Sequence, residues 1–103
     1  MCPRFHSDRV LCRLITTYRG AATEWLHDGA VKRERLGTGS RSLPDGRSGL
    51  YRRATDVQRL DEGDVALLKG DAWEGNEGGG LIHRSPDARP GGARLLLTLD
   101  FSD

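Results

Sequence analysis

Two side chains of the types that bind metals lie near the start of the chain, in the stretch FHSDRV at residues 5–10. His6 and Asp8 are separated by one residue, so in an extended strand both point to the same face. Imidazole nitrogens and carboxylate oxygens are common metal ligands, but two residues do not complete a site. A third ligand must therefore come from elsewhere in the sequence.

The remaining histidines are His27 and His83, and His83 is the better candidate for the third ligand. It ends a short apolar run, LIH, after a glycine-rich approach, whereas His27 follows Trp25 and Leu26 in a polar turn where we expect it to be solvated. Two histidines and one carboxylate on one face of an octahedron leave three positions open, which suits non-haem Fe(II). Zinc is the alternative metal, because it accepts the same ligand types.

The strand that would carry His6 and Asp8 runs to Tyr18, with apolar and polar residues alternating. Even positions hold the more apolar set together with both ligands, so we expect that face to point inward. Thr16 and Tyr18 share this face with His6 and Asp8.

Further strands are predicted in TDVQRL, VALLKG, LIH and RLLLTLDF, and one or two helical turns in GAVKRERLG. The run VALLKG is typical of a buried strand, and the leucines of RLLLTLDF suggest burial on both faces. The segment near residues 37–50 is rich in Gly, Ser and Pro and predicts a flexible surface loop. The chain is therefore predicted to be all-β with minor α, in one domain over residues 1–103.

Composition excludes several classes of partner. The 16 basic and 15 acidic residues nearly cancel and form no stripe, so we expect no nucleic-acid binding. No apolar run approaches the ~20 residues of a membrane helix, and the start MCPRFHSD lacks a secretory signal. Only two cysteines are present, and no disulfide framework is predicted. A cytoplasmic protein that does not bind membranes is the expectation.

Arg94 lies eleven positions after His83, at the start of the last predicted strand. The order His-x-Asp, distant His, then Arg resembles the motif of the Fe(II)/2-oxoglutarate oxygenases. The resemblance implies that His6, Asp8 and His83 hold Fe(II) and that Arg94 grips the far carboxylate of 2-oxoglutarate. A planar guanidinium does this in a bidentate way. The resemblance also implies that Thr16 and Tyr18, on the predicted face of His6 and Asp8, line the co-substrate site.

Longer blocks carry a second resemblance: CRLITTYRGAATEWL, VALLKGDAWEGNEGGGLIHRSP and RLLLTLDF. They are similar to an uncharacterised bacterial domain-of-unknown-function family, which implies a family without implying a reaction. We expect a double-stranded β-helix of the cupin-like (jelly-roll) kind, incomplete at its N-terminus, because members are longer and the last strand is apolar on both faces.

Substrate contacts are expected from Arg84 and Ser85, directly after the distal histidine, and from Trp73, which either lies in the core or walls a pocket. The substrate, a small molecule or a protein, is not indicated. Two alternatives to an oxygenase remain: a non-catalytic, zinc-handling cupin-like protein, and an inactive truncated family member.

Overall fold

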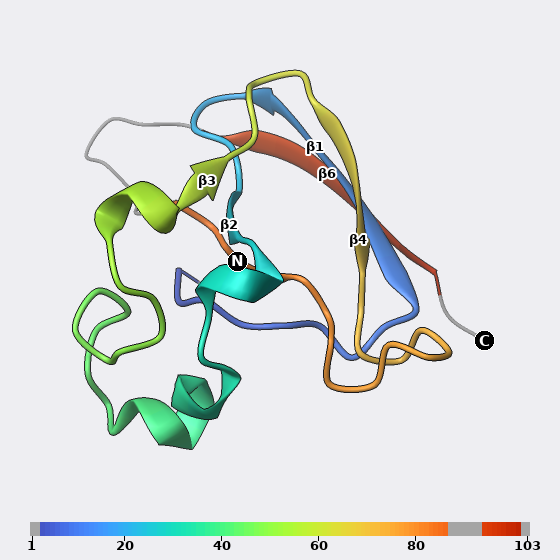
Figure 1. Ribbon diagram of the computed structural model, residues 1–103. Coiled ribbons are helices and arrows are strands. Elements are labelled where there is room, and N and C mark those ends of the chain that lie inside the picture. The colour runs from blue at the N-terminus through green and yellow to red at the C-terminus, as the bar shows by residue number, and fades with distance from the viewer. Residues whose placement is uncertain (1–2, 87–93, 102–103) are drawn as a thin grey trace.

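The computed structural model describes residues 3–86 and 94–101. Two small antiparallel sheets, ordered β4-β1-β6 and β3-β2-β5, make up most of the regular structure (Figure 1). The strands are β1 (Cys12–Arg19), β2 (Glu24–Leu26), β3 (Gln58–Arg59), β4 (Val65–Lys69), β5 (Ile82–Arg84) and β6 (Leu95–Phe101). Short 3₁₀ helices cover Asp28–Ala30, Arg33–Arg35, Gly37–Ser40 and Ala54–Asp56.

The predicted predominance of strands is confirmed, and the helical content of the described residues is 3₁₀ rather than α. The strands predicted near residues 58, 65, 82 and 95 all form, whereas the short strand β2 was not predicted. The two sheets do not close into a barrel over the described ranges, so the double-stranded β-helix is not confirmed.

The first strand begins later than predicted, at Cys12 rather than at His6. The turn after β4 explains this difference, because its amides bind the carbonyls of the preceding segment. Asp71 N–H donates to Asp8 O (2.7 Å) and Gly70 N–H to Leu11 O (2.9 Å). The chain bends over residues 9–11, which breaks the alternation that the sequence suggested.

As a result, the odd positions of β1 face inward and the even positions face outward. Ile15 is 1% exposed, whereas Leu67 and Leu99, the register partners of Leu14 on the other face, are 59% and 50% exposed. Directly paired residues share a face. The prediction that even positions point inward is therefore wrong, and so is the prediction that VALLKG is buried, because β4 is an edge strand.

The apolar core lies beneath the smaller sheet and is completed by the turn-rich segment. Phe5, Leu26, Leu50 and Ile82 are each at most 4% exposed and form one cluster. Val31, Leu36, Tyr51 and Val57 pack around it. The segment near residues 37–50, predicted as a surface loop, thus contributes Leu50 to the core. Within the described ranges, no helix is both long and apolar enough to cross a bilayer.

Candidate metal centre

Strand pairing brings the two histidines together. His6 lies beside β5 and forms an antiparallel bridge with His83, with N–H···O distances of 3.0 and 2.9 Å. On its other side, His83 pairs with Trp25 of β2. Directly opposed residues project to the same face, and the centroids of the two imidazole rings are 4.6 Å apart.

Asp8 completes a group of three ligand types. Its Oδ1 lies 3.5 Å from His6 Nε2 and its Oδ2 lies 3.1 Å from His83 Nε2. All three candidate ligand atoms lie within 4.8 Å of one another. The structure therefore brings together His6, Asp8 and His83, the set that the sequence singled out.

Backbone carbonyls orient both imidazole rings. His6 Nδ1 is 2.7 Å from Arg4 O, and His83 Nδ1 is 2.9 Å from Leu81 O. In a neutral ring, a proton on Nδ1 that is donated to a carbonyl leaves the Nε2 lone pair for a metal. These contacts assign the tautomer, and each Nε2 faces Asp8.

Two of the three ligand side chains carry buried polar atoms without a hydrogen bond. Among the described residues, His83 Nε2 and Asp8 Oδ2 are buried and have no partner in hydrogen-bond geometry, although they are only 3.1 Å apart and Arg13 Nη1 forms an ion pair with the same Asp8 oxygen. Such groups are costly to bury unsatisfied. Ligand atoms held at ~2.0–2.2 Å from one ion are separated from each other by roughly 3–3.5 Å. The donor set therefore fits a divalent metal.

Arg13 of β1 holds the carboxylate of Asp8. Its Nη1 is 3.0 Å from Asp8 Oδ2, and its Nη2 donates to Asp100 Oδ2 at 2.9 Å. Burial raises the pKa of Asp8, but the neighbouring imidazoles of His6 and His83 and the charge of Arg13 outweigh burial, so the pKa lies well below its ordinary value. Asp8 is ionised, as a metal ligand must be.

Comparison with known proteins assigns the family. A family model described as "Protein of unknown function (DUF1826)" matches residues 1–100. The chain is a member of the DUF1826 family. Neither the curated proteins nor the solved structures contain a match to it. The resemblance to a domain-of-unknown-function family is thus confirmed, while the family description names no reaction.

Thr16 and Tyr18 of the DUF1826 chain lie on the outer face of β1, opposite to the face on which Arg13 reaches Asp8. Thr16 is buried, and Tyr18 is 58% exposed. Because the chain bends at residues 9–11, the alternation of faces is broken, and the even positions of β1 do not lie on the same face as Asp8. The structure therefore does not bring these two residues to the three ligands.

Arg84 and Trp73 have structural partners. Arg84 Nε donates to Glu24 Oε1 (2.8 Å), its Nη1 donates to Asp45 Oδ2 (3.0 Å), and its guanidinium lies 4.1 Å from the centre of the Phe5 ring. Trp73 lies in the turn after β4, with Lys69 Nζ 5.0 Å from its ring centre. Both residues thus have roles in the fold that need no substrate.

Ser85 and Arg94 also carry buried polar atoms, which lie outside the group of three candidate ligands. Ser85 Oγ and the Nε and Nη2 atoms of Arg94 are buried without a hydrogen bond among the described residues. Burial lowers the pKa of Arg94. By alternation, Arg94 belongs to the face of Leu96, the inner face of β6. No contact in the described ranges joins it to the three ligands.

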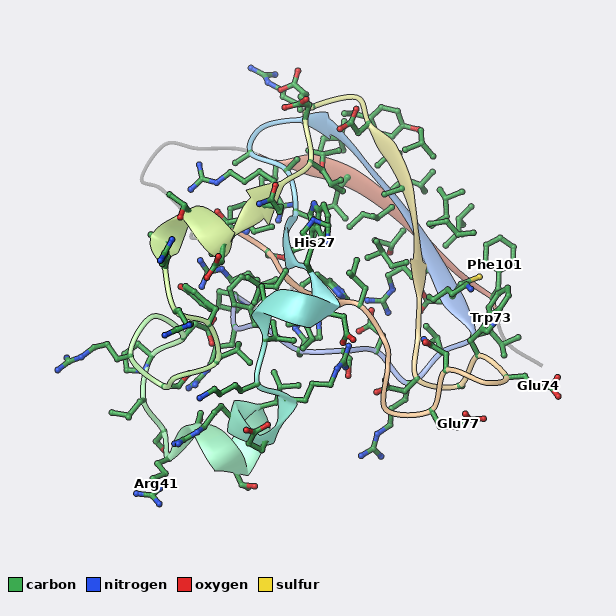
Figure 2. The ribbon with its side chains drawn as sticks, viewed as in Figure 1. His27, Arg41, Trp73, Glu74, Glu77 and Phe101 are labelled. Atoms are coloured by element: carbon green, nitrogen blue, oxygen red, sulfur yellow. The ribbon has the colours of Figure 1, made fainter. Side chains whose placement is uncertain are left out.

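A hollow of about 300 Å³ adjoins the candidate ligands on the side of His6. Its walls are partly apolar, from Phe5, Leu36 and Leu50, and two guanidinium groups line it, those of Arg4 and Arg35. His27, by contrast, is exposed and stacks edge-on against Trp25, with ring centres 4.6 Å apart (Figure 2). The prediction that His27 is solvated is confirmed.

Proposed function

We propose that this DUF1826 chain binds one divalent transition-metal ion through His6, Asp8 and His83, and that it uses Fe(II) and 2-oxoglutarate in oxygenase chemistry. The observation that carries the proposal is the pair of buried atoms without a hydrogen bond, His83 Nε2 and Asp8 Oδ2, which converge with His6 on one point. Two histidines and one carboxylate are the ligand set of non-haem Fe(II) oxygenases.

The residues of the chain have separate tasks in this proposal. The carbonyls of Arg4 and Leu81 fix the histidine rings, so that both Nε2 atoms are ready to bind without reorganisation. Asp8 supplies negative charge, and Arg13 restrains its carboxylate through Oδ2. When bound, Fe(II) with 2-oxoglutarate and oxygen supplies the oxidising power for attack on a C–H bond.

Arg94 is proposed as the anchor of the co-substrate. A guanidinium whose Nε and Nη2 atoms are buried without a hydrogen bond among the described residues is stabilised by an anion, and a carboxylate accepts two parallel N–H bonds from it. The partly apolar hollow beside His6 is the proposed place of the substrate, next to the metal and walled by Phe5 and Leu50. Ser85, whose hydroxyl has no hydrogen bond among the described residues, is proposed as a further polar contact for the substrate.

A zinc-binding function without catalysis is the second candidate, and the same geometry supports it. Separations of 3.1 and 3.5 Å between ligand atoms suit tetrahedral zinc as well as octahedral iron. The two functions differ at Arg94, which an oxygenase requires for its co-substrate and a zinc protein does not.

The test is an anaerobic titration of the purified chain with Fe(II), without and then with 2-oxoglutarate, followed by visible absorption. Bidentate chelation of iron by 2-oxoglutarate gives a weak charge-transfer band, which we expect in the wild type and in the exposed control variant Arg52→Ala. Arg94→Ala should bind iron but lose the band. Iron binding without a band in the wild type would exclude the oxygenase and leave the zinc candidate.

A further inference from the structure

The outer face of the β4-β1-β6 sheet is largely apolar, and the described residues leave its large side chains exposed. Here the outer face means the even positions of β1, their register partners on β4 and β6, and Leu95, which shares a face of β6 with Leu97 by alternation. Seven large apolar side chains on it are between 38% and 67% exposed: Tyr18, Val65, Leu67, Leu95, Leu97, Leu99 and Phe101. Figure 2 shows Phe101 of β6, and Trp73 of the turn after β4, on the side of the larger sheet that lies away from the smaller one.

Charge is almost absent from this face. Among the described residues, its charged side chains lie at the two ends: Lys69 at one end of β4, next to Trp73, and Arg19 at the end of β1, where it pairs with Leu95 after a bulge. Arg13 of β1 and Asp100 of β6 bind each other on the inner face. Depletion of charge together with large apolar side chains is the composition of an interface core and not that of a solvated surface.

The size of the face matches half of a protein interface. Seven such side chains, each about half exposed, present on the order of 600 Å² of apolar surface, at the upper end for a patch on a monomer. A standard stable interface buries roughly 800 Å² per partner. The outer face comes close to this area when the less exposed neighbours Leu14 and Trp73 are included.

Its shape and charge favour one occupant. The face is a pleated sheet surface, and two such surfaces pack at ~10 Å with their strands nearly aligned. A two-fold axis brings the same patch of two subunits together, which a self-complementary apolar surface allows. An anionic membrane would favour a cluster of several basic residues, whereas the described part of this face carries two, Lys69 and Arg19, at its opposite ends.

We propose that the outer face is the interface of a symmetric homodimer, in which two copies of this chain pack their β4-β1-β6 sheets face to face. This proposal does not depend on the metal centre, because the three ligands lie on the other side of the sheet, where Arg13 contacts Asp8. Each subunit keeps its own metal-binding group.

The mass of the full chain in solution tests the proposal, by sedimentation equilibrium at about 50 µM. We expect twice the chain mass of 11.3 kDa. Leu97→Glu and Leu99→Lys each place an unpaired charge in the interface and should weaken the dimer at least ~100-fold. Thr98→Glu, between them on the same strand but on the inner face, is the matched control and should remain dimeric.

A second measurement locates the interface. In a mixture of isotope-labelled and unlabelled chains, we expect intermolecular nuclear Overhauser effects that connect the leucine methyls of β6 to Phe101 or Tyr18. A monomeric wild type would overturn the proposal and leave the face for another polypeptide. Higher aggregates, or a dimer whose intermolecular contacts come from other residues, would overturn it equally.

Discussion

His6 and His83 exchange both of their backbone hydrogen bonds, at 3.0 and 2.9 Å, although they lie near opposite ends of the chain. Because the same bridge sets the direction of both side chains, the metal-binding group is a direct product of strand pairing. Asp8 follows two residues after His6 and is held by Arg13 from the larger sheet. The three ligands therefore depend on both sheets being in place.

Gly70 is a position where the fold and the candidate site can be disturbed together. A Cβ there would lie 2.0 Å from Val10 O and 2.8 Å from Asp8 O, both of them backbone atoms. We expect Gly70→Ala to lower the free energy of unfolding by about 1–3 kcal/mol and to weaken metal binding, because the segment around Asp8 must move.

Gly29→Ala is the matched control for this substitution, since no atom lies within 4 Å of its added Cβ. We expect a change of less than ~0.5 kcal/mol and unchanged metal affinity. Urea denaturation and zinc titration measure both quantities. Equal stability of the two variants would contradict the close approach of the turn to residues 8–11.

Leu50 and Leu43 test the packing of the turn-rich segment. Leu50 is 1% exposed in the apolar core, whereas Leu43 is 42% exposed. Leu50→Ala should cost about 2–4 kcal/mol in the free energy of unfolding, because it leaves a cavity against Phe5 and Leu26. Leu43→Ala should cost less than ~1 kcal/mol. Similar losses in both variants would show that this segment is not packed as described.

The pair Arg13 and Asp100 predicts a pH dependence. The hydrogen bond from Arg13 lowers the pKa of Asp100, which is ordinarily about 3.9. A depressed folded-state pKa means that the pair stabilises the fold above the unfolded pKa and that this contribution is lost as the pH falls through the folded pKa. Carboxyl NMR titration should give Asp100 a midpoint below 3.9.

In Arg13→Gln the midpoint of Asp100 should move up toward its ordinary value, because the charged donor is gone. The decrease in the free energy of unfolding at acid pH should then also be smaller than in the wild type. An identical midpoint in the two proteins would mean that the pair does not persist in solution.

The three ligands could be predicted from the sequence because their residue types and order are distinctive and because His83 lies in a short apolar run that predicts a strand. The role of Arg13 could not, since its two partners, Asp8 and Asp100, lie far apart in the chain and meet it only through tertiary structure. Arg13 also lies on the odd face of β1, which the sequence predicted to point outward.

The main error of the sequence interpretation was its prediction of which face of β1 points inward. Strict alternation from His6 to Tyr18 would place Thr16 and Tyr18 beside Asp8, but Gly70 and Asp71 bind the carbonyls of residues 8–11 and bend the chain there. A period of two holds only while the backbone stays extended. The strands themselves were predictable because their β-branched and leucine-rich runs are bounded by turn residues.

The most direct test of the metal centre is isothermal titration of the metal-free chain with Zn(II), in wild type, His83→Ala, Asp8→Asn and the exposed control His27→Ala. We predict one ion per chain in the wild type and in His27→Ala, and an affinity at least ~100-fold lower in the other two variants, with folding checked by circular dichroism. Equal zinc affinity in the folded wild type, His83→Ala and Asp8→Asn would contradict the assignment of these residues as metal ligands.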